Sequence, residues 1–227
     1  MEGILTSCLY SFGCPELRQF GAEKFFFEFL KNTEKTKLPL VRTILEKLEP
    51  YYFYSLIGYK NNLPPFSQRV VRAHWLGNNL LKRIEKEDVK ELFKEKKFQG
   101  HQTRFIKIFD LIGGKPHHNF STLWLIKKIE NLNPNLKMIE DCLVRAGKVV
   151  EIKEEKFVVE TQRLVLDRKK LRLQEVIEEI PRFFLKRPVK FNDWISIHFG
   201  VAREKISRDC AQNLQRIIQE AILFFEE

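Results

Sequence analysis

The hydrophobic positions in the first part of the chain recur with the period of an α-helix. Between residues 16 and 131, apolar side chains return every three or four positions in segments separated by Gly, Pro and Asn. The pattern predicts one amphipathic helix over residues 16–32 and another over residues 66–84, which Ser67 caps. On the first helix we expect Leu17, Phe20, Phe27 and Leu30 to share the apolar face. These segments predict an all-α N-terminal domain.

The pattern changes after the Asn- and Pro-rich segment NLNPN at residues 131–135. Residues 142–152 (CLVRAGKVVEI) and 156–160 (KFVVE) are rich in β-branched side chains. RLVLD and KLRLQ alternate apolar and polar residues around a turn near residues 167–169, which is typical of a hairpin. WISIHFGVA (residues 194–202) is the last predicted strand, and Ser207 caps a final helix. The predicted fold is α+β: a helical domain over residues 1–136, then a small OB-like antiparallel β-barrel with a C-terminal helix over residues 137–227.

The composition adds a basic charge and no sign of a membrane span. Forty Lys and Arg stand beside 30 Asp and Glu, which gives a formal net charge of +10. A basic OB-type module that binds nucleic acid is therefore an alternative, with strand aromatics stacking on bases. No apolar run approaches the roughly 20 residues of a membrane helix. The N-terminus has an early Glu and no basic run before its apolar stretch, so we expect no secretory signal and a cytoplasmic location.

Two separated motifs in the second part of the chain resemble one family. CL at residues 142–143, GKVVEI at 147–152 and VV at 158–159 are similar to the first hairpin of the HypC-type nickel–iron hydrogenase maturation chaperones. NDWISIHFGVA at residues 192–202, followed by Lys205 and Ile206, resembles that family's last strand before its C-terminal helix. A weaker resemblance covers the whole chain. VVRAHWLGNNLL, the HHNF that follows Pro116 and the HypC-like tail look like an uncharacterised bacterial family.

The resemblance implies a role in carrying iron. HypC-type chaperones hold an iron with cyanide and carbon monoxide ligands on a cysteine, and they bind a maturation scaffold and the hydrogenase large-subunit precursor. Carried over to this chain, Cys142 would be the iron-binding thiolate and His198 the histidine near it. Thiolate is a strong ligand for low-spin iron, and imidazole can assist it. The alternative from the residues themselves is that Cys142 and His198 are packed strand residues.

A second group of polar residues lies in the helical part. His117 and His118 follow a Gly-Gly-Lys-Pro turn, and His74 shares the apolar side of a predicted helix with Trp75. Asn78, inside that helix, needs hydrogen-bond partners if it is buried. A metal-dependent enzyme built on His117 and His118 is therefore a further alternative, and a structural loop is the plain interpretation. Since the chain has no serine-triad order, paired-carboxylate motif or nucleotide fingerprint, we expect an accessory protein rather than an enzyme.

Overall fold

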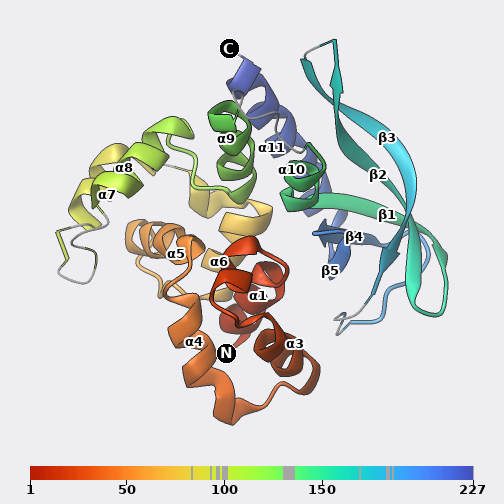
Figure 1. Ribbon diagram of the computed structural model, residues 1–227, viewed down its shortest axis with the longest axis horizontal. Coiled ribbons are helices and arrows are strands. Elements are labelled where there is room, and N and C mark those ends of the chain that lie inside the picture. Colours follow the sequence, from red (N-terminus) through yellow and green to blue (C-terminus); the bar gives the residue numbers. More distant parts are fainter. Residues whose placement is uncertain are drawn as a thin grey trace. The chain divides into compact units, whose positions relative to one another are not determined.

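The structure is a computed structural model that describes residues 1–82, 84–92, 94–95, 98, 102–129, 136–168, 170–182, 185 and 187–226 (Figure 1). The chain divides into two compact units, Met1–Ser121 and Thr122–Glu227, called here the N-terminal and C-terminal units. The division falls 15 residues before the expected boundary, at residue 121 against 136, and lies inside helix α9 (His118–Ile129). The NLNPN segment at residues 131–135, on which that boundary was based, lies outside the described residues.

The described residues of the N-terminal unit are helical, as the sequence predicts. Its helices are α1 (Glu2–Ser11), α2 (Pro15–Gln19), α3 (Glu23–Asn32), α4 (Leu38–Leu45), α5 (Glu49–Lys60), α6 (Gln68–Leu76), α7 (Lys86–Leu92), α8 (Gln102–Leu111) and the start of α9, with short 3₁₀ turns at Lys35–Lys37 and Asn79–Leu81. Helix α1, which the sequence did not predict, packs on α6. Gly3 permits this approach, because a Cβ there would lie 1.9 Å from the carbonyl oxygen of Phe66.

Two predicted helices are wrong in extent. The helix over residues 16–32 is two helices, since Gly21 adopts a left-handed φ of 62° between α2 and α3. The buried face of α3 is formed by Phe26, Phe29 and Leu30, whereas Phe20 is 52% exposed. The helix that begins after Ser67 ends at Leu76 instead of residue 84, because Gly77 leaves the helical region.

The C-terminal unit is built on one five-stranded antiparallel sheet. Its elements are the rest of α9, α10 (Leu136–Cys142), β1 (Arg145–Ile152), β2 (Lys156–Asp167), β3 (Lys170–Pro181), β4 (Trp194–His198), β5 (Val201–Ile206) and α11 (Arg208–Glu226). The strand order is β3-β2-β1-β4-β5. The α+β class and the closing helix are confirmed, but the sheet is not a closed barrel. The twelve residues of β3 pair only with β2 and the six of β5 only with β4, so the last ladder that closure requires is missing among the described strands.

The strand boundaries also differ from the prediction. Residues 156–167 form one long strand that pairs with β3 from Lys156↔Pro181 to Asp167↔Lys170, which confirms the predicted hairpin. Figure 1 shows that this β2–β3 hairpin extends past β1, β4 and β5. The predicted last strand, WISIHFGVA, is itself a hairpin. Phe199 and Gly200, with φ of 49° and 63°, form the two-residue turn between β4 and β5.

One hydrophobic cluster of the C-terminal unit lies on one face of this curved sheet. Its buried members are Val149, Phe157, Val159, Ile180, Ile195, Ile197 and Ala202. Helix α11 packs on β1, β3 and β4, and its N-terminus is capped as predicted: the Ser207 hydroxyl accepts a bond from the backbone N–H of Cys210. No helix in the described part of the chain is long and apolar enough to cross a membrane.

Candidate metal centre

Cys142 is the last residue of α10, not the first of a strand as the sequence suggested. The backbone N–H of Leu143 bonds to the carbonyl oxygens of Ile139 and Glu140, which ends the helix directly after the cysteine. The thiol is half-buried and forms no disulfide. The hydroxyl of Thr122, at 3.7 Å, donates a hydrogen bond to Cys142 Sγ. The thiol is thus reachable and held on one side by a hydroxyl donor.

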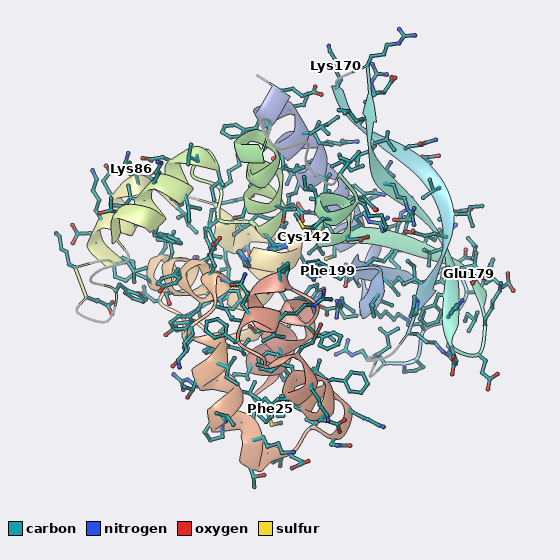
Figure 2. The ribbon with its side chains drawn as sticks, viewed as in Figure 1. Phe25, Lys86, Cys142, Lys170, Glu179 and Phe199 are labelled. Atoms are coloured by element: carbon teal, nitrogen blue, oxygen red, sulfur yellow. The ribbon has the colours of Figure 1, made fainter. Side chains whose placement is uncertain are left out.

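His198 is the last residue of β4 and is fully buried. The tight turn of Phe199 and Gly200 follows it at once and reverses the chain into β5. The backbone N–H of Phe199 donates a 2.7 Å hydrogen bond to the carbonyl oxygen of Asp141. This bond fastens the hairpin turn to the end of α10, and Figure 2 shows Cys142 and Phe199 in this region.

The fold brings Cys142 and His198 together. Sγ of Cys142 and a ring nitrogen of His198 lie within 4.8 Å of each other. Two such ligands on one metal ion stand roughly 3.5 Å apart, given metal–sulfur and metal–nitrogen bonds of about 2.3 and 2.0 Å. The pair therefore needs only a small side-chain adjustment to share an ion. A thiolate and an imidazole together suit soft or borderline metals such as iron, zinc or copper.

A buried cation lies beside this pair. Arg203 on β5 is 1% exposed, and its Nε and Nη2 donate to the carbonyl oxygen of His198 at 3.0 and 2.8 Å. These two bonds fix the backbone that carries the imidazole. They also place a positive charge next to His198 in a site screened from water, where electrostatic interactions are strong.

A buried ion network holds α10 against the sheet. Arg145 on β1 is 3% exposed and contacts Glu140 on α10 at 3.2 Å and Glu178 on β3 at 2.8 Å. Arg163 on β2 pairs with the same Glu178 and approaches Glu140 at 3.8 Å. Because Glu140 lies two residues before Cys142, this network sets where the thiol stands.

The second predicted polar group lies in the N-terminal unit. His74 and His117 are each 1% exposed, and burial lowers the pKa of both imidazoles, that of His117 to about 3. The neighbouring His118 ring, whose centroid is 5.8 Å from that of His74 and 4.2 Å from that of Trp75, lowers both pKa values further. Both buried rings are therefore neutral at physiological pH.

Backbone hydrogen bonds fix the tautomers of these two rings. Nδ1 of His74 donates to the carbonyl oxygen of Pro116, whereas Nδ1 of His117 accepts from the backbone N–H of Asn119. Nε2 of each ring is buried and has no hydrogen-bond partner among the described residues. Phe53 stacks on the His74 ring with the centroids 5.0 Å apart, so these imidazoles belong to an aromatic core.

Asn78 has a local role. Its Oδ1 accepts from the backbone N–H of Leu80, and its Nδ2 donates to the carbonyl oxygen of Arg69. The side chain thus caps the 3₁₀ turn that follows α6 and uses its amide on backbone groups. The partners that a buried Asn would need are backbone groups of α6 and of the turn, and not a polar site.

Several residues around the Cys142–His198 pair had no signal in the sequence. Thr122 and Arg203 lie on other elements than Cys142 and His198, and Glu140, two residues before Cys142 on α10, acts through an ion pair with Arg145 of β1 that no spacing rule reveals. Alternation along β1 could have placed Arg145 on the face of Gly147 and Val149, but Arg203 lies at a bulge of β5 between Ala202 and Glu204, which alternation does not reveal. A buried arginine with named carboxylate or carbonyl partners is a property of the folded chain.

Searches of curated proteins and of solved structures find no match to the chain. A family model does match it, over residues 34–226, and is described as a family of unknown function (DUF6390). The match spans most of both units, including His74, His117, Cys142 and His198. The chain therefore belongs to the DUF6390 family.

Proposed function

We propose that this protein is an accessory protein of nickel–iron hydrogenase maturation that carries an iron-centre intermediate on Cys142 and His198. The observation that supports the proposal is the approach of the cysteine sulfur and the histidine ring nitrogen to within 4.8 Å. Both residues lie in the C-terminal unit, where the two motifs that resemble the HypC-type chaperones are found.

The donor set suits a cargo better than a permanent cofactor. One thiolate and one imidazole bind low-spin iron and leave its other positions to cyanide and carbon monoxide. Two protein ligands also hold an ion less firmly than the four of a closed structural site, which permits transfer. The buried guanidinium of Arg203 beside His198 favours a cargo of negative charge, such as iron that bears cyanide.

The partners in this proposal are a hydrogenase maturation scaffold and the hydrogenase large-subunit precursor. A carrier meets both in turn, so its loaded site must be reachable from the surface. Cys142 is half-buried at the end of α10, which meets that need, while His198 supports it from inside the unit.

Two features weigh against the alternatives. His117, the first residue of the alternative enzyme site, is 1% exposed and is closed to a substrate. Of the aromatic residues on the five strands, Phe157 is buried and Trp194 alone is partly exposed, so the sheet offers no row of rings on which bases could stack.

The test is anaerobic purification of the full chain from its own host, followed by iron analysis and infrared spectroscopy. The wild type should contain iron and show cyanide and carbon monoxide stretching bands. Cys142→Ala should lose both, and His198→Ala should lose most of the iron. Cys210→Ala, which removes a thiol from α11 outside the pair, should leave iron content and bands unchanged.

If neither the wild type nor the variants contain iron or show cyanide and carbon monoxide bands, the carrier role is contradicted. Iron that persists in Cys142→Ala would place the metal on other residues and would equally contradict the proposal.

A further inference from the structure

A second site lies on the C-terminal unit, apart from the Cys142–His198 pair. A pocket of about 460 Å³ is lined by residues of β1, β2, β3, β4 and α11. Its size is that of a pocket for a small molecule or a short peptide. None of the residues around the thiol and imidazole lines it.

The strand register explains how the pocket is built. Trp194 pairs with Lys148, Lys148 with Glu160, and Glu160 with Ile177, so these four side chains form one row across β4, β1, β2 and β3. Directly paired residues of antiparallel strands lie on the same face of the sheet. Glu175 on β3, which pairs with Gln162, adds a second carboxylate to this face.

The charge of the pocket is opposite to that of the whole protein. Glu160 and Glu175 are exposed, and neither forms an ion pair with a residue that the structure describes. The other two carboxylates of β3 form ion pairs: Glu178 pairs with Arg145, and Glu179 pairs with Lys153 and Lys156. Among the described residues that line the pocket, two carboxylates stand against the one ammonium group of Lys148, so the lining has an excess of one negative charge on a chain whose net charge is +10.

The walls add apolar surface to this charge. Ile177 is 69% exposed, and the indole of Trp194 is half-buried at the other end of the row. An aromatic face near carboxylates suits a guanidinium or ammonium group through cation–π attraction and ion pairing. An aliphatic side chain exposed at the rim suits an apolar neighbour of that cation.

The length of the row selects the occupant. Four strands spaced about 4.8 Å apart place Trp194 and Ile177 roughly 14 Å from each other along the sheet. An extended peptide of about four residues covers that distance at roughly 3.3 Å per residue. We propose that this pocket binds an extended segment of a partner protein that carries an arginine or lysine between apolar side chains. A phosphate backbone is disfavoured, because the two carboxylates would repel it.

The test measures the anisotropy of labelled five-residue peptides added to the full-length protein. One peptide has a central Arg between two Leu, and its control has citrulline, which keeps the shape and removes the charge. The Arg peptide should bind, and citrulline should weaken binding about tenfold or more, since a charge-assisted hydrogen bond contributes at least that factor. The double variant Glu160→Gln/Glu175→Gln should produce the same loss.

The matched control is Glu154→Gln/Glu155→Gln, which removes the same charge from the exposed β1–β2 turn and should leave binding within about twofold. Equal binding of the Arg and citrulline peptides would overturn the proposal, as would an unchanged affinity in the Glu160/Glu175 variant or no binding of either peptide. Binding of a single-stranded oligonucleotide that is lost in Trp194→Ala would assign the pocket to nucleic acid and also overturn it. Since neither peptide binding nor oligonucleotide binding is measured through iron, the result is independent of the carrier proposal.

Discussion

The backbone N–H of Phe199 donates a hydrogen bond of 2.7 Å to the carbonyl oxygen of Asp141. One partner is the residue after His198, and the other is the residue before Cys142. The thiol and the imidazole are therefore joined through a single backbone contact between the β4–β5 turn and the end of α10. Changes that disturb this turn or this helix end should alter metal binding even when both ligands are intact.

The turn itself gives the first prediction. Gly200→Ala should lower the free energy of unfolding by about 1 to 2 kcal/mol, because an L-residue is strained at its left-handed φ of 63°. It should also reduce the iron content, since the strain is relieved by moving the turn that holds His198. Chemical denaturation and metal analysis measure the two effects.

Gly21→Ala is the matched control for this variant. Gly21 has a φ of 62° and, like Gly200, faces open space where an added Cβ would lie, but it belongs to the N-terminal unit. The stability loss should be similar, and the iron content should stay at the wild-type level. Equal iron loss in both variants would show that general destabilisation, and not the turn, controls loading.

Thr122 should control the reactivity of Cys142. Its hydroxyl donates to Sγ, and a donor stabilises the thiolate form that reacts with electrophiles. Thr122→Val keeps the shape and removes the donor, so alkylation of Cys142 by iodoacetamide at neutral pH should slow by about threefold to tenfold. Peptide mass spectrometry measures the rate, with Cys210 as the internal reference. Thr122→Ser should retain the wild-type rate, and an unchanged rate in Thr122→Val would contradict the assigned hydrogen bond.

The buried ion network should dominate the stability of the C-terminal unit. Arg145→Met leaves the buried Glu140 without its closest cation and removes one of the two arginines that pair with the half-buried Glu178, and removal of one member of such a network costs about 3 to 5 kcal/mol. Urea unfolding followed by circular dichroism measures the loss. Lys153→Met, which breaks an exposed pair with Glu179, should have a far smaller effect. Comparable losses in the two variants would mean that burial of the network contributes little.

His117 should make stability depend on pH. Its folded pKa is lowered to about 3 by burial, whereas the unfolded value is 6.5, so the unfolded state binds one more proton between these limits. By linkage, the free energy of unfolding falls as the pH drops from about 6.5 toward 3, by roughly 1.4 kcal/mol per pH unit for this group. Its contribution to stability is fully present above about pH 6.5.

The variant that tests this dependence is His117→Asn, which can still accept the bond from the N–H of Asn119. Between about pH 6.5 and 4.5 its unfolding free energy should change less steeply with pH than that of the wild type. The slopes should differ by roughly 1.4 kcal/mol per pH unit, which corresponds to the uptake of about one proton on unfolding. Denaturant titrations at several pH values give both slopes. Identical slopes would mean that His117 is charged in the folded state or that the ring opens to water.

The sequence alone determined the parts of this protein that depend on local chemistry. Helical periodicity identified the N-terminal unit beyond α1 as helical, alternation around residues 167–169 identified the β2–β3 hairpin, and Ser207 marked the start of α11. It also singled out Cys142 and His198 through their resemblance to a known family. The helices, the hairpin and the helix start could be predicted because propensity, capping and side-chain period act over a few neighbouring residues.

Tertiary structure decided where those elements end and which residues meet. The helix predicted over residues 16–32 divides at Gly21, and the strand predicted over residues 194–202 reverses at Phe199 and Gly200, because chain direction depends on what each segment packs against. The same holds for the approach of Cys142 to His198 and for the contacts of Arg145 and Arg203, which join elements distant in the sequence. Whether the sheet closes depends on pairing between β3 and β5, and no local pattern specifies a contact of that range.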